Sequence, residues 1–123
     1  MKIEFERFDH VMLCIPIGAE EQARHFYGTI LGLTELTEQS LGFPLPKRAI
    51  WFQMGNVQLH MRAEGEQQLS ERHPAFQIKN LEEAEQLLTS HGVSVKHESK
   101  IPGRIRFSFR DPFNNRIELI EMI

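Results

Sequence analysis

Two halves of the chain show the same order of predicted elements, and this internal repeat constrains the fold more than any other feature. Each half reads strand, helix, strand and hairpin, over about residues 8–62 and about residues 72–122. A period of roughly sixty residues is too long for the unit of a solenoid. The repeat therefore predicts a pseudo-symmetric pair of βαβββ modules within one α+β domain at 1–123.

The predicted elements follow from apolar periodicity and from turn residues. In the first half they are a strand at 8–15, a helix at 19–31, a short strand at 33–36, a loop at 40–47, and strands at 49–53 and 57–62. In the second half they are a strand at 73–78, a helix from 81 that ends at Gly92, and strands at 93–97, 105–110 and 116–122. Asn80 and Glu83 are typical of a capping box. The polar segment 63–71 is the predicted linker.

Strand alternation divides each sheet into an apolar face and a mixed face. The apolar face is expected to carry the helix, and it comprises Val11, Leu13, Ile15, Ile50, Phe52, Val57, Leu59, Met61, Phe76, Ile78, Ile105, Phe107, Phe109, Ile117 and Leu119. The mixed face comprises His10, Met12, Cys14, Trp51, Gln53, Gln58, His60, Arg62, His73, Ala75, Gln77, Arg106, Ser108, Arg110, Arg116, Glu118 and Ile120. A face with so many polar groups is not a second core, because unpaired buried polar groups are costly. Apolar residues with a few polar groups are typical of a small-molecule site.

The composition argues against several classes of partner. The formal net charge is −3 and the basic residues are scattered, so nothing favours nucleic acid. No apolar run approaches the length of a membrane span, and the charged start lacks a signal-peptide core. The single cysteine, Cys14, allows no internal disulfide. A cytoplasmic location is expected.

Four side chains on the mixed face are good metal ligands, and each half supplies two of them. His10 and His73 lie near the start of the first strand of their halves, whereas His60 and Glu118 lie on the last strand. A pseudo-twofold axis would bring such equivalent positions together. Imidazole nitrogens and a carboxylate suit Zn, Ni, Mn or Fe(II), so one divalent metal per site is predicted. No local spacing motif is present, and each histidine alone also fits an ordinary strand residue.

Several segments resemble the vicinal oxygen chelate superfamily, which includes glyoxalase I, bleomycin resistance proteins, fosfomycin resistance enzymes, methylmalonyl-CoA epimerase and extradiol dioxygenases. The matching segments are 9–13, 26–33, 51–52, 57–60, 72–76 and 109–119. The resemblance covers nearly the whole chain and implies a glyoxalase-like cupped sheet formed by the two modules. In the turn at 111–115, Phe113 and Asn114 replace the Asp and Gly that are usual in the family. Asn tolerates positive φ, so the turn is expected to persist.

The resemblance also implies a metal site and a chemistry. The metal positions of the family map onto His10, His60, His73 and Glu118, and Glu118 is the expected catalytic proton shuttle. Metal-binding members commonly have Glu or Gln at the position of His60, which leaves the metal preference open. The implied activity is that of a glyoxalase I-like lyase or isomerase, in which a proton is transferred on a small substrate chelated by the metal.

Four further residues on the mixed face are expected to contact the substrate: Trp51, Gln58, Arg106 and Ser108. Arg106 would pair with a ligand carboxylate or phosphate, or else remain solvated. Trp51 would stack on a planar ligand or simply fill the cup. Fosfomycin-type thiol transfer is disfavoured, because the family has a Tyr where this chain has Ser108.

Two other functions remain open at this stage. The first is a metal-free protein that binds a small molecule or an antibiotic, as bleomycin resistance proteins do. The second is an Fe(II) extradiol-type dioxygenase. A homodimer is expected by resemblance, and the sequence leaves open whether the cup forms within one chain or across two.

Overall fold

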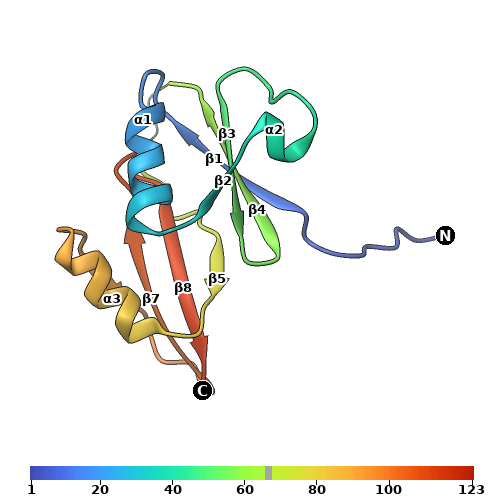
Figure 1. Cartoon of the computed structure of the whole chain (residues 1–123). Coiled ribbons are helices and arrows are strands. Elements are labelled where there is room, and N and C mark those ends of the chain that lie inside the picture. The colour runs from blue at the N-terminus through green and yellow to red at the C-terminus, as the bar shows by residue number, and fades with distance from the viewer. Residues whose placement is uncertain (66–67) are drawn as a thin grey trace.

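The computed structural model describes residues 1–65 and 68–123, and it contains two modules of the same architecture (Figure 1). Module one comprises β1 (His10–Ile15), α1 (Glu20–Ala23), the π-helix η1 (Arg24–Ile30), β2 (Thr34–Leu36), α2 (Glu38–Leu41), β3 (Ala49–Met54) and β4 (Val57–Ala63). Module two comprises β5 (Ala75–Gln77), α3 (Leu81–Ser90), β6 (Val95–His97), β7 (Arg104–Arg110) and β8 (Arg116–Met122). The predicted linker at 63–71 falls partly outside the described residues, because 66–67 are not among them.

The two sheets have the same strand order, which confirms the predicted α+β fold of two βαβββ modules. The order is β1-β4-β3-β2 in module one and β5-β8-β7-β6 in module two. In each sheet the first strand is parallel to the last, and the other neighbours are antiparallel. None of the helices among the described residues is long and apolar enough to cross a membrane.

Several predicted boundaries differ from the structure, and three of the differences have a clear physical reason. The strands predicted at 8–15 and 93–97 each begin two residues later, at His10 and Val95. The single helix predicted at 19–31 is a short α-helix continued by η1, whose wider turns include a hydrogen bond from Leu31 N to Phe26 O. β5 begins after Pro74, which has no N–H to donate to a ladder. The loop predicted at 40–47 begins inside α2, a helix too short to show an apolar period.

The helix α3 is capped by a residue far away in the sequence, so the predicted capping box is wrong. Asn80 is the N-cap residue and its carbonyl accepts the N–H of Ala84, but its side chain caps no helix N–H and donates to Glu83 Oε2 instead. The backbone N–H of Leu81 donates to Oε1 of Glu121 on β8, at 2.7 Å. A carboxylate suits this end of a helix, because free N–H groups and the helix dipole favour negative charge there.

The strand registers place the predicted apolar and mixed residues on opposite faces. Met12 and Trp51 both lie opposite His60, and Ser108 lies opposite Glu118. The apolar face forms the core, whose fully buried members include Ile15, Tyr27, Ile50, Phe52, Leu59, Met61, Leu88, Phe107 and Ile117. Ile105 was expected in this core but is 43% exposed, at the start of β7 beside the turn at 101–104.

A buried hydrogen-bond network joins the two modules. The Tyr27 hydroxyl of module one donates to Asp111 Oδ2 of module two at 2.6 Å. Asp111 Oδ1 accepts the backbone N–H groups of Phe113 and Asn115, both at 2.9 Å. Asn115 Nδ2 then donates to the carbonyl of Cys14 on β1 at 3.0 Å. Asn114 has φ of 73°, so the turn predicted at 111–115 persists with Asn in the left-handed region.

We expect Tyr27→Phe to lower the free energy of unfolding by about 1–3 kcal/mol, because it leaves a buried carboxylate oxygen with one donor fewer. Urea denaturation followed by circular dichroism measures the change. Thr34→Val removes a hydroxyl from an exposed position on β2 and serves as the control. Equal stability of the two variants would contradict a structural role for the Tyr27–Asp111 hydrogen bond.

Candidate functional site

The mixed face of module one carries a stack of three rings. His60 is 8% exposed and lies parallel to Trp51, with ring centroids 3.7 Å apart and an interplanar angle of 3°. His10 lies on the other side of His60, with centroids 4.1 Å apart and an angle of 16°. Gln58 Oε1 is 2.8 Å from His60 Nε2. The strand register therefore brings four of the predicted site residues into contact.

His60 is a neutral imidazole at physiological pH. Burial, and secondarily the neighbouring His10, lowers the pKa of His60 to about 4. A neutral imidazole keeps a lone pair on one ring nitrogen, as a metal ligand requires. The same neutrality also suits aromatic stacking against Trp51.

His10 is oriented by the residue that precedes it. His10 Nδ1 is 2.8 Å from Asp9 Oδ2, and this hydrogen bond is the main cause of the lowered pKa of the Asp9 carboxyl. A carboxylate on one ring nitrogen fixes the tautomer and leaves the other nitrogen for a ligand. Asp9 was not among the predicted site residues.

The mixed face of module two holds the second pair of predicted ligands. His73 Nε2 lies 3.0 Å from Glu118 Oε1, and Arg106 Nη1 donates to Glu118 Oε2 at 3.1 Å. The Glu118 side chain is 5% exposed. Arg106, predicted to contact a ligand, is thus paired with the protein's own carboxylate and is shielded from solvent.

The second ring nitrogen of His73, Nδ1, lies close to one oxygen atom and one nitrogen atom of other residues. His73 Nδ1 is 2.8 Å from the Glu71 carbonyl and 3.0 Å from Arg116 Nη1. With a proton on Nδ1, the ring donates to Glu71 and presents a free lone pair at Nε2. With the proton on Nε2, it donates to Glu118 and accepts from Arg116. Only the first tautomer can ligate a metal through Nε2.

A second carboxylate lies behind Ser108, and sequence reasoning missed it. Glu98 Oε1 accepts from Ser108 Oγ at 2.5 Å and from Arg116 Nη2 at 2.8 Å. Hydrogen bonds from Ser108 and then Arg116 lower the pKa of the Glu98 carboxyl. The β6–β7 register places Lys96 opposite Ser108, so the position two residues after Lys96 shares their face. Extending that alternation beyond β6 would have found Glu98.

The four predicted ligands form two separate pairs within one chain. His10 contacts His60 in module one, and His73 contacts Glu118 in module two. Across residues 1–65 and 68–123, no group of three or more His, Cys, Asp or Glu side chains is arranged to hold a metal ion. Each module therefore holds two of the four predicted ligands.

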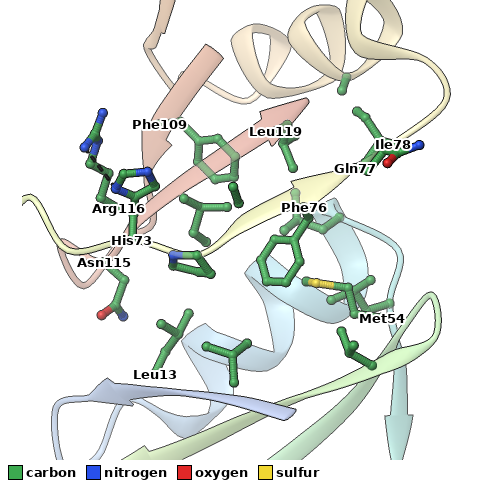
Figure 2. Close-up of a pocket in the computed structure, with 18 of the residues that line it drawn as sticks. Leu13, Met54, His73, Phe76, Gln77, Ile78, Phe109, Asn115, Arg116 and Leu119 are labelled. Carbon is green, nitrogen blue, oxygen red and sulfur yellow. Dashed lines mark hydrogen bonds between the residues drawn. The ribbon is translucent and has the colours of Figure 1, made fainter. Parts of the chain in front are cut away.

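A cavity of about 1630 Å³ lies between the two modules. Figure 2 shows Leu13 of β1 on one side of it and Phe76 and Leu119 of module two on the other, with His73 and Arg116 together at one end. The apolar lining comes from the faces that carry the helices. The cavity also reaches the mixed faces, whose members among its lining residues are Met12, Cys14, His73, Ala75, Gln77 and Arg116.

Comparisons with known proteins agree with this architecture. The family model described as Glyoxalase/Bleomycin resistance protein/Dioxygenase superfamily matches residues 7–119. The chain belongs to this superfamily. The structure of a Bacillus anthracis protein described as a glyoxalase family member is 36% identical, covers 100% of both chains and superposes with a TM-score of 0.85. No curated protein sequence matches the chain.

More distant solved structures show the same fold. The fosfomycin resistance protein FosX from Listeria monocytogenes, complexed with Mn(II) and sulfate, is 18% identical, with coverage of 98% of this chain and 93% of that one and a TM-score of 0.75. Lactoylglutathione lyase from Agrobacterium tumefaciens is also 18% identical, with coverage of 94% and 92% and a TM-score of 0.72. The fold is thus shared with proteins described as a fosfomycin resistance protein and a lactoylglutathione lyase.

The Cys14 thiol on the mixed face is expected to react slowly with disulfide reagents. Burial, followed by a hydrogen bond to Glu64, raises the pKa of Cys14 to about 11. At pH 8.5 we expect a rate about tenfold below that of free cysteine, because the lower thiolate fraction outweighs the higher nucleophilicity. Glu64→Gln should accelerate the reaction, whereas Glu82→Gln, on the exposed side of α3, should not. A rate equal to that of free cysteine would contradict the assignment.

Proposed function

We propose that the chain is a metal-dependent enzyme of the superfamily, with a glyoxalase I-like lyase activity on a small molecule. The supporting observation is the orientation of two histidines on the mixed faces. Nδ1 of His10 and Nδ1 of His73 each lie 2.8 Å from an oxygen acceptor, and a proton on each Nδ1 leaves a lone pair on Nε2. Nε2 of His73 lies 3.0 Å from Glu118 Oε1, its proposed co-ligand. Metal-ligating histidines are typically held in this way.

The residues fit a divalent ion by their chemistry. Three imidazoles and one carboxylate, from His10, His60, His73 and Glu118, suit Zn, Ni, Mn or Fe(II). When bound, such an ion would polarise adjacent oxygens of a substrate and stabilise negative charge on them. The Mn(II) complex of the related FosX supports a divalent ion on this scaffold.

We propose that the complete site forms between two copies of the chain. Within the described part of one chain the two pairs do not form one group, and each pair has half of the donors. A homodimer with twofold symmetry would place His10 and His60 of one copy against His73 and Glu118 of the other, twice. The predicted cup would then be closed by modules of different copies.

The chain's own residues would carry the proton and orient the substrate. Glu118 is the proposed general base, which takes a proton from a substrate carbon next to a carbonyl and returns it to the neighbouring carbon. The Arg106 guanidinium, at 3.1 Å from Glu118 Oε2, orients the carboxylate. Trp51, Gln58 and Ser108 are proposed to line the substrate side of the cup. Cys14, as the only cysteine, agrees with a reducing cytoplasmic setting.

Elemental analysis of the purified protein tests the metal site. We expect about one divalent ion per chain, lost in His73→Ala and in Glu118→Ala, because each variant removes a ligand. His97→Ala is the control, since His97 is exposed and pairs with Glu85 on α3. A wild type that contains no metal and takes up none of Zn, Ni, Mn or Fe(II) would refute the site.

Mixing two inactive variants tests whether the site is shared between copies. His10→Ala damages module one and His73→Ala damages module two, so each homodimer lacks an intact site. A mixed dimer would contain one intact site and one doubly damaged site. Random mixing should therefore restore about a quarter of the wild-type metal content. No recovery in a mixture shown to contain mixed dimers would place the site within one chain.

The activity is tested with the hemithioacetal of methylglyoxal and glutathione. We expect turnover by the metal-loaded wild type and a loss of about 100-fold or more in Glu118→Gln, because the amide cannot accept the proton. Glu82→Gln serves as the control. Equal rates for Glu118→Gln and the wild type would exclude Glu118 as the base.

A metal-free small-molecule binding protein is the second candidate. The stack of Trp51, His60 and His10 favours it, because the exposed face of His10 extends a flat aromatic surface that a planar ligand can cover. Thermal shifts by planar drugs in a metal-free wild type would support this function over the enzyme.

A further inference from the structure

The segment that precedes β1 leaves the body of the molecule and exposes large apolar side chains. Figure 1 shows residues 1–9 extending away from both modules. Ile3 is 78% exposed and Phe5 is 89% exposed, and Phe8 is also largely exposed. Among the described residues, no hydrogen bond or ion pair involves residues 1–6. An extended arm with several uncovered apolar side chains is typical of a segment that binds another surface.

The arm has two chemically different sides. In an extended chain Ile3 and Phe5 point to one side, and Glu4 and Glu6 point to the other. Arg7 pairs with Asp9 inside the arm, so it does not neutralise these glutamates. The surface that receives the arm must therefore offer apolar area beside positive charge.

Module two carries such a surface at the end of β8. Met122 is 47% exposed and lies opposite Arg104 on β7, and Ile101 in the preceding turn is 40% exposed. The Arg104 guanidinium forms no hydrogen bond or ion pair with the described residues, and its Nε is buried. An Arg without an acceptor is costly, so it favours a carboxylate from outside the chain. Lys100 adds a second positive charge nearby.

We infer that the arm of one copy binds along β8 of a second copy, with Ile3 and Phe5 against Met122 and Ile101. The inference rests on the proposed function, in which His10 of one copy faces Glu118 of the other. A pseudo-twofold axis between the facing modules, as the internal repeat predicts, would make β1 antiparallel to β5 of the partner. The partner's β8 is parallel to its β5, so β1 would be antiparallel to β8 as well. Backward from His10, the arm therefore runs in the direction from Glu118 to Met122.

The length of the arm agrees with this path. An extended chain rises about 3.3 Å per residue, so Phe5 lies up to about 17 Å from His10 and Met122 lies about 13 Å from Glu118. Glu4 and Glu6 then fall near Arg104 and Lys100. Asp9 is the last residue of the arm, so binding of the arm would also hold the carboxylate that orients His10.

Sedimentation equilibrium of the full chain, with the native metal loaded, tests the arm. The double variant with Ile3→Ser and Phe5→Ser should weaken dimerisation about tenfold or more, because it removes two apolar side chains that the dimer would bury. The control is Ile17→Ser, which makes the same change at another exposed position. Met122→Ser should weaken the dimer like the arm variant, and combining Met122→Ser with the arm variant should add little. A dimer that the arm variant leaves unchanged would overturn the inference while the shared site stands.

A charge exchange tests the direction of the arm. Arg104→Glu should weaken the dimer, and adding Glu4→Arg and Glu6→Arg should restore it at least in part. Weakening without rescue would overturn binding at β8. A wild type that is monomeric but retains one metal per chain would overturn both this inference and the shared site. A metal-free dimer that the arm variant weakens would support the inference and refute the metal.

Discussion

The Asp111 carboxylate is the contact on which the arrangement of the two modules depends. It accepts the Tyr27 hydroxyl from module one, and it accepts the amide of Asn115 together with backbone N–H groups of its own turn. Asn115 in turn donates to the backbone of β1. Buried carboxylates persist only when their oxygens are satisfied, so this turn cannot shift without breaking several hydrogen bonds. Because β1 carries His10 and β8 carries Glu118, the same network sets how far apart the half-sites lie within one chain.

The sequence predicted the fold correctly where the apolar alternation of the strands and the internal repeat of the two halves indicate the same elements. Both are local signals, and they predict that Trp51 and His60 share the mixed face, on which the two rings stack. The capping of α3 was not predictable in this way. Asn80 and Glu83 have the spacing of a capping box, but the carboxylate of Glu121 binds the first helical N–H because β8 passes that end of the helix. Competition between a local and a distant acceptor is decided by tertiary packing, which periodicity does not report.

The sequence predicted the pair of candidate ligands within each module, but not how the two pairs are arranged relative to each other. Equivalent positions in the repeat identified His10 with His60 and His73 with Glu118, and each pair is in contact within its module. The surrounding acceptors were not predictable in this way. Asp9 falls on the apolar side of the alternation in the strand predicted at 8–15, and Glu98 lies just beyond the strand predicted at 93–97. Whether the two pairs meet depends on how copies associate. Association is a property of two surfaces, and no periodicity within one chain encodes it.

The pairing of the first strand with the last in each module has a consequence for synthesis on the ribosome. β1 becomes paired once β4 has emerged, so module one can close while module two is still being made. Module two cannot close before β8 has been made. β5 pairs with β8, and the first N–H of α3 donates to the Glu121 carboxylate on β8. The apolar faces of module two therefore stay open until β8 has emerged. During that interval the nascent chain presents an unpaired β5 edge, which a chaperone or a neighbouring nascent chain can bind.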